Sequence, residues 1–317
     1  MTLRLEKCKI PVSDPPRNLL GMVAMSEEVD AADITDVIVF LHGFPDLAVH
    51  PTKLEFGSRL VRKLATYFCV KNTNPVQLAL ATFNSSGIFG SDQEIKFYNK
   101  RLSLEVEDAL AGCAFVRKKF QHPVRIHVVG HSTGAILASL LRSKSDLVDS
   151  VTVIAGLLDL PNAYIYDFDA TQCEQFQVNG FCWKEFYLPK DYILDVKRYQ
   201  VSLDGKQPIS SQVDTALIGP KVYFKLSREY KEEYVKSRES SSNLNIESSV
   251  RCETSTPILI IHGDDDNAVP HKNGVELFEA AAEPKTFVSI PNANHMLRND
   301  KHLKKALRAI MKHIQSL

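Results

Sequence analysis

Short apolar runs alternate with longer amphipathic segments in the first half of the chain and again near its end. A run of four or five mostly apolar residues is typical of a strand buried on both faces, because neither side of such a strand meets water. The runs predict five strands, at residues 37–41, 78–81, 126–129, 151–154 and 257–261.

The segments between these runs have helical periodicity. Apolar residues recur at three- and four-residue steps from Leu102 to Phe120, which places them on one face of a helix. Similar patterns predict helices at 53–70, 133–145, 272–282 and 300–316. Alternating strands and helices are typical of an α/β domain with a parallel sheet and right-handed crossovers. The N-terminal residues add a short strand to this prediction.

The alternation stops near residue 160 and resumes at 257. We therefore expect a core formed by 1–160 and 257–317, with 161–256 inserted as a cap or lid. About half of the chain's aromatic residues fall in this insertion. They are expected to form a small core of their own, to line an apolar pocket facing the main sheet, or to do both. The Ser-rich stretch 237–249 predicts an exposed connection.

Composition narrows the function classes. Lys and Arg number 38, as do Asp and Glu, so the chain lacks the overall basic excess that is usual for nucleic-acid binders, which leaves only a local basic patch as an alternative. No apolar run approaches the ~20 residues of a membrane span, and the N-terminal residues lack the apolar stretch of a secretory signal. The six cysteines are scattered without metal-ligand spacing. We therefore expect a cytoplasmic protein with reduced thiols and no metal.

Residues Gly130–Gly134 match the pattern G-x-S-x-G. The motif follows a predicted strand and opens a predicted helix, which is the context it requires. Small residues at 130 and 134 permit a turn so sharp that the serine hydroxyl stands exposed above the sheet. Ser132 is therefore the predicted nucleophile.

A serine hydroxyl needs a base to remove its proton. His295 lies in a loop after the apolar stretch 286–290 and before the last helix, where the chain order nucleophile, acid, histidine places the base. We expect His131 to point away from the serine and His271 to lie at the surface. His42 and His262 each end a strand and are expected to have structural or oxyanion-loop roles.

The acid that orients the base should follow a late strand. His262–Asp266 offers three carboxylates there, and Asp266 fits best because its loop can reach the histidine loop. Asp264 is the second choice, and Asp159 after the preceding strand is a distant alternative. The oxyanion would bind to two backbone N–H groups, those of Thr133 and of Phe44 in His42-Gly43-Phe44.

Together these motifs resemble the α/β-hydrolase superfamily of serine hydrolases. The resemblance rests on His42–Phe44, Gly130–Gly134, His262–Pro270 and Asn294-His295, and it spans about 36–156 and 257–316. It implies a mostly parallel eight-stranded sheet flanked by helices, with an inserted cap. The family acid typically falls three residues after the glycine and before x-x-Val-Pro, which favours Asp266.

The segment Phe83–Asp92 is similar to the corresponding segment of small intracellular esterases, including cinnamoyl/feruloyl-type and monoacylglycerol-lipase-like enzymes. The sequence departs from that pattern at Phe89, where a second glycine is usual. The resemblance implies hydrolysis of carboxylic esters with small to medium apolar or aromatic acyl groups, through an acyl-enzyme and without a cofactor.

Three alternatives remain open. A thioesterase acting on acyl-CoA or acyl-protein would use the same mechanism. An acyl-CoA enzyme should place cations at the pocket mouth, for which the candidates are Lys96, Lys100, Arg101, Lys184, Lys190 and Arg198. An amidase or peptidase would need an acidic or otherwise selective subsite for an amine, which the sequence does not locate. A non-catalytic ligand-binding protein could also use this fold.

Overall fold

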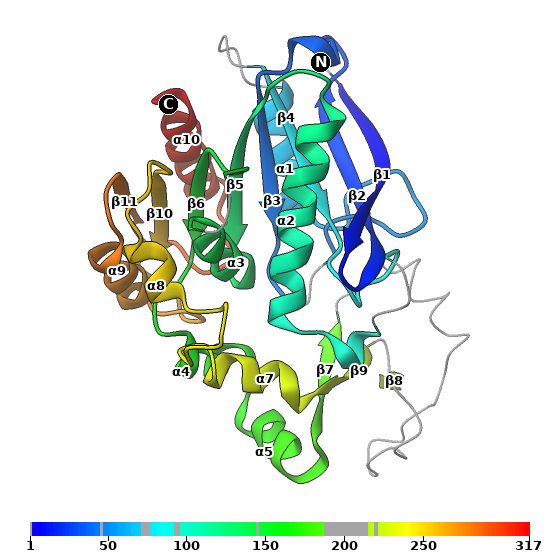
Figure 1. Ribbon diagram of the computed structural model, residues 1–317, viewed down its shortest axis with the longest axis vertical. Coiled ribbons are helices and arrows are strands. Elements are labelled where there is room, and N and C mark those ends of the chain that lie inside the picture. Colours follow the sequence, from blue (N-terminus) through cyan, green and yellow to red (C-terminus); the bar gives the residue numbers. More distant parts are fainter. Residues whose placement is uncertain are drawn as a thin grey trace.

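The computed structural model describes residues 2–44, 47–70, 77–91, 96–143, 146–186, 215–218 and 221–317. An eight-stranded sheet with helices on both faces forms its centre (Figure 1). The strands are β1 (Leu3–Ser13), β2 (Pro16–Ser26), β3 (Asp36–Leu41), β4 (Leu78–Phe83), β5 (Arg125–His131), β6 (Ser150–Ile154), β10 (Ile258–Gly263) and β11 (Lys285–Ile290). Their order is β1-β2-β4-β3-β5-β6-β10-β11, with β1 at one edge. The pairings of β2 are antiparallel and the others are parallel.

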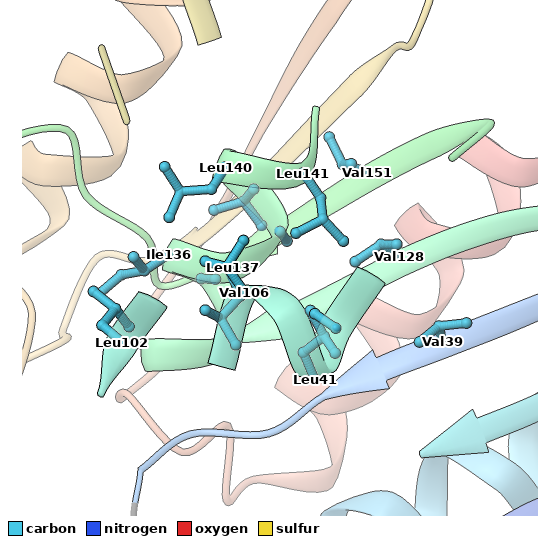
Figure 2. Close-up of a cluster of buried hydrophobic side chains, with 14 of the residues drawn as sticks. Val39, Leu41, Leu102, Val106, Val128, Ile136, Leu137, Leu140, Leu141 and Val151 are labelled. Carbon is cyan, nitrogen blue, oxygen red and sulfur yellow. The ribbon is translucent and has the colours of Figure 1, made fainter. Parts of the chain in front are cut away.

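Each face of the sheet has its own hydrophobic core. In β3, Val37, Val39 and Leu41 face one core and Ile38 and Phe40 the other, because successive side chains point to opposite faces. Two helices cover the sheet on the side of the first core, α2 (Leu102–Lys119) and α3 (Thr133–Leu141). Figure 2 shows part of their contact with the strands. The first core also includes part of α9 (His271–Ala280). On the opposite face lie α1 (Arg59–Ala65) and α10 (Asp300–Gln315).

The predicted α/β class, the mostly parallel sheet and the five predicted strands are confirmed. Two predictions were wrong in detail. The predicted helix 53–70 begins only at Arg59, because Ser58 caps it by accepting a hydrogen bond from Val61 N. The short N-terminal strand is instead a hairpin of two eleven-residue strands, β1 and β2.

The segment between β6 and β10 carries elements of its own. These are α4 (Leu160–Asp167), α5 (Ala170–Asn179), β7 (Phe181–Phe186), β8 (Thr215–Ile218), β9 (Lys221–Ser227), α7 (Arg228–Val235) and α8 (Ile246–Arg251). The three strands form a separate antiparallel sheet, β7-β9-β8. In Figure 1, α4, α5, α7 and this sheet lie below one end of the main sheet. Of the residues named in the sequence analysis, Asp92, Lys190 and Arg198 lie outside the described residues, as do three aromatic residues of the insertion, Tyr187, Tyr192 and Tyr199.

The prediction of an exposed connection at 237–249 holds for 238–243, which are mostly exposed, but is wrong for the residues that follow. Leu244, Ile246 and Val250 are buried, and Asn245 caps α8 by accepting a hydrogen bond from Ser248 N. Close to the end of α8, the buried Arg142 guanidinium donates to the carbonyl oxygens of Val250, Thr256 and Ala282. The apolar residues Ile246 and Val250, four positions apart, therefore form the buried face of a helix although serines surround them.

None of the helices in the described ranges combines the length and apolar composition needed to cross a bilayer.

A buried ion pair joins the hairpin to α2. Arg17 Nη2 lies 2.7 Å from Asp108 Oδ1, and both side chains are almost fully buried. Ser86 joins the pair, since its amide and its hydroxyl both donate to Asp108. The network fixes β2, the segment after β4 and α2 together, because a buried carboxylate with satisfied partners tolerates little movement.

We expect Asp108→Ala to destabilise the fold by about 3–5 kcal/mol, because it leaves the Arg17 guanidinium buried without a counter-charge. The free energy of unfolding from urea titration measures this. Lys119→Ala is the control: its partner Glu6 is more than half exposed, so the change should cost at most about 1 kcal/mol. Equal losses in the two variants would contradict the prediction.

Candidate active site

Ser132 lies on the turn between β5 and α3. Its backbone has φ 58° and ψ −122°, a strained conformation for a residue with a side chain. A Cβ atom at Gly130 would lie 2.0 Å from Gly134 O, and one at Gly134 would lie 2.1 Å from Leu41 O. Only glycine fits at both positions, and this close approach lets the turn present the Ser132 hydroxyl at the end of the sheet.

The structure brings the three predicted site residues together. His295 Nε2 lies 3.0 Å from Ser132 Oγ, and His295 Nδ1 lies 2.8 Å from Asp266 Oδ2. Ser132, Asp266 and His295 follow β5, β10 and β11, whose carboxyl ends meet at one edge of the parallel sheet. This chain of hydrogen bonds can pass a proton from the hydroxyl to the imidazole and orient the imidazole through the carboxylate.

The Asp266 carboxylate is held in its ionised form. Its Oδ1 atom accepts hydrogen bonds from the amides of Ala268 and Val269, at 2.9 and 2.8 Å. Burial alone would raise the pKa of Asp266. The hydrogen bonds from His262, His295 and Val269 outweigh burial and keep this pKa well below its usual range.

The two other candidate acids have different partners. Asp264 Oδ1 accepts a hydrogen bond from Asn292 N at 2.6 Å, which supports the turn that leads to His295. Asp159 lies before α4, where its Oδ2 atom accepts from Asn162 Nδ2. Of the three carboxylates considered from the sequence, Asp266 is therefore the one hydrogen-bonded to His295.

Two backbone amides lie beside the serine. Thr133 is the first residue of α3, and Phe44 follows β3 by three residues. A Cβ atom built on Gly43 would lie 3.1 Å from Ser132 Cβ, so this loop runs directly past the nucleophile. Neither amide donates a hydrogen bond to another described residue. Within the described part of the chain, both donors are therefore available to a negatively charged oxygen.

Two buried histidines support the site, and a structural role was expected from the sequence for His262 but not for His131. His131 Nε2 lies 2.8 Å from the backbone oxygen of His295 and donates to it. His262 Nε2 donates to Val269 O at 2.9 Å and lies 3.5 Å from Asp266 Oδ2. Each histidine is next to a motif glycine, but these bonds connect separate loops, and no local pattern identifies the partner.

The described residues contain no group of three or more His, Cys, Asp or Glu side chains that could hold a metal ion.

Residues 87–302 match the family model of Hydrolase_4, serine aminopeptidase S33. The chain belongs to this family. It is accordingly a hydrolase of the α/β-hydrolase superfamily, as the sequence motifs predicted. Its sequence matches no curated protein.

Solved structures share the fold of this Hydrolase_4 member at low identity. The esterase Est1E of Butyrivibrio proteoclasticus, solved with ferulic acid bound, is 19% identical with a TM-score of 0.60 over 98% of each chain. The esterase domain of a Rhodothermus marinus protein is 17% identical with a TM-score of 0.58, over 97% of this chain and 96% of that one. The acylaminoacyl peptidase of Pyrococcus horikoshii is 14% identical with a TM-score of 0.59, over 99% of this chain but 42% of its own. These similarities establish the fold.

We expect the stability of this hydrolase to fall as the pH drops from about 6.5 to about 4. Burial lowers the pKa of both His42 and His131 to about 4. Between that value and the ~6.5 of an unfolded histidine, only the unfolded chain binds the proton, so acid favours unfolding. Each histidine contributes up to about 1.4 kcal/mol per pH unit in this window. In His131→Gln, the free energy of unfolding should depend less steeply on pH; parallel curves would refute the assignment.

Proposed function

We propose that the protein hydrolyses carboxylic esters with Ser132 as nucleophile, His295 as base and Asp266 as the orienting acid. The observation that carries the proposal is the continuous hydrogen-bond chain from Ser132 Oγ through His295 to Asp266. Membership in a hydrolase family supports it independently.

The geometry supports a two-step reaction. His295 Nε2 takes the Ser132 proton while Oγ attacks the ester carbonyl carbon, and the Phe44 and Thr133 amides stabilise the oxyanion. The intermediate collapses as His295 donates its proton to the leaving alcohol, which leaves the acyl group on Ser132. Water, activated by the same imidazole, then releases the acid. No step requires a cofactor.

The proposed substrates carry small to medium apolar or aromatic acyl groups. Est1E, which shares the fold, was solved with the aromatic acid ferulic acid. We further propose that residues 161–256 act as a cap over this end of the sheet, since Tyr230 of α7 packs on Phe44.

Three of the six cations considered for an acyl-CoA site give it no support, while Lys96 is exposed and Lys190 and Arg198 lie outside the described residues. Lys100 is buried and paired with Glu105, and it also donates to Ser85 Oγ at 2.7 Å. Arg101 pairs with Glu229. Lys184 is largely buried and donates to a backbone oxygen. These three cations are held in internal contacts and do not form the cationic mouth that a CoA substrate would need.

Amide hydrolysis is the second candidate, because the matched family is described as a serine aminopeptidase. Assays of aminoacyl p-nitroanilides beside p-nitrophenyl esters of increasing acyl length compare the two activities. Higher kcat/KM for the anilides would replace the ester proposal.

We expect Ser132→Ala to lower kcat by about 10⁶-fold, because removing one member of a triad disables the whole unit. A fluorophosphonate probe should add once to the wild-type protein and not to the variant, as measured by intact mass. Retained turnover in a folded variant would disprove the nucleophile assignment. A wild-type protein that is folded but neither labelled nor active would favour a ligand-binding role.

We expect Asp266→Asn to lower kcat by about 10⁴-fold, because an amide in place of the carboxylate favours the wrong tautomer of His295. Asp264→Asn is the matched control, since it changes a neighbouring carboxylate that bonds to Asn292 N. Steady-state kinetics on one ester compare the two variants. A larger loss in Asp264→Asn would show that the acid was assigned to the wrong residue.

A further inference from the structure

The side chain of Phe44 lies between two aromatic rings. Phe97, in the 3₁₀ turn Phe97–Asn99, stacks at 5.8 Å between ring centroids with an interplanar angle of 13°. Tyr230 of α7 stacks at 5.0 Å with an angle of 22°. One ring follows β4 in the core and the other belongs to the proposed cap, so Phe44 bridges the two parts of the chain.

Tyr230 is itself firmly held. It is fully buried, and its ring packs against Phe168 and Tyr234. The Tyr234 hydroxyl donates to Asp167 Oδ2 at 2.7 Å, which ties α7 to the end of α4. Because it is buried and packed between the rings of Phe168 and Tyr234, the Tyr230 ring can act as a rigid support for the ring of Phe44.

The surroundings of Phe44 leave little room for a ligand. The hollow that Phe44 lines with His42, Gly43 and Leu137 has a volume of about 20 Å³, close to the space of one water molecule. Lys184 Nζ lies 5.5 Å from the Phe44 ring centroid and adds a cation–π contact. The ring is therefore held by contacts with the rings of Phe97 and Tyr230 and with Lys184.

We propose that Tyr230 is a positioning residue for the oxyanion hole, holding the Phe44 amide in place by stacking on the Phe44 ring. The proposal rests on the proposed function, in which that amide binds the oxyanion. The ring and the amide belong to one residue at the end of a strand, and Gly43 fixes the chain on the other side of the amide against Ser132. An oxyanion donor acts on the transition state, so displacing it lowers kcat more than it raises KM.

Tyr230→Leu tests the proposal. We expect kcat for a p-nitrophenyl ester to fall about 10- to 100-fold with KM nearly unchanged, below the ~10²–10³ of a completely lost donor. A trifluoromethyl ketone, whose hemiketal oxygen occupies the oxyanion hole, should bind more weakly by the same factor. Tyr230→Phe keeps the stacked ring and should retain wild-type values for both measurements.

Two further variants make the test specific. Tyr234→Phe removes the bond to Asp167 but keeps the ring that packs on Tyr230, so it should retain kcat and ketone affinity. Phe97→Leu removes the opposite ring of the stack and should reproduce the loss, which keeps the proposal testable if Tyr230→Leu fails to fold.

The outcomes separate the two proposals. A folded wild-type protein without esterase or amidase activity would refute the proposed function. An active wild-type protein with unchanged kcat in Tyr230→Leu or Phe97→Leu would refute the positioning role alone. Equal losses in Tyr230→Leu and Tyr234→Phe, or a loss in KM only, would also refute it, because either result indicates a general disturbance of the cap or of substrate binding.

Discussion

The close approach of three backbone segments at the serine turn is the constraint on which the site depends. Gly130 lies against the Gly134 carbonyl, and Gly134 lies against the carbonyl of Leu41. The end of β5, the start of α3 and the end of β3 therefore pack as one unit. This packing holds Ser132 in its strained backbone conformation. It also sets the position of the Phe44 loop, because the end of β3 cannot shift without moving the start of α3.

The loops around this turn are held by buried polar groups whose charges suit the chemistry. Asp266 is anionic and lies between two imidazoles. His131 is neutral across the usual pH range because burial lowers its pKa to about 4, so it can support the His295 carbonyl without repelling a positive His295 ring. A second cation at that place would oppose the imidazolium that the proposed reaction forms.

Local patterns predicted the parts of the molecule that have local causes. The strands at 37–41 and 126–129 are buried on both faces, and the motif at Ser132 requires a tight turn. Both conditions restrict the residue types at consecutive positions, so they can be recognised in the sequence. The start of α1 and the position of α8 do have local signals, the capping residues Ser58 and Asn245, which the apolar spacing and the serine content did not reveal. The hydrogen bond from His131 to His295 depends on residues that are far apart in the chain. The stacking of Tyr230 on Phe44 is of the same kind, because aromatic residues suit a small core and a pocket equally well.

The edge strand β1 has a consequence for how copies of the protein meet. An edge strand presents unpaired backbone groups that can pair with a strand of another molecule. On β1, however, Arg4, Glu6 and Lys9 are exposed, and so is Pro11, whose nitrogen carries no hydrogen to donate. Charged side chains and a proline on the same edge disfavour sheet-to-sheet pairing, so the hairpin protects the long parallel sheet from extension into aggregates.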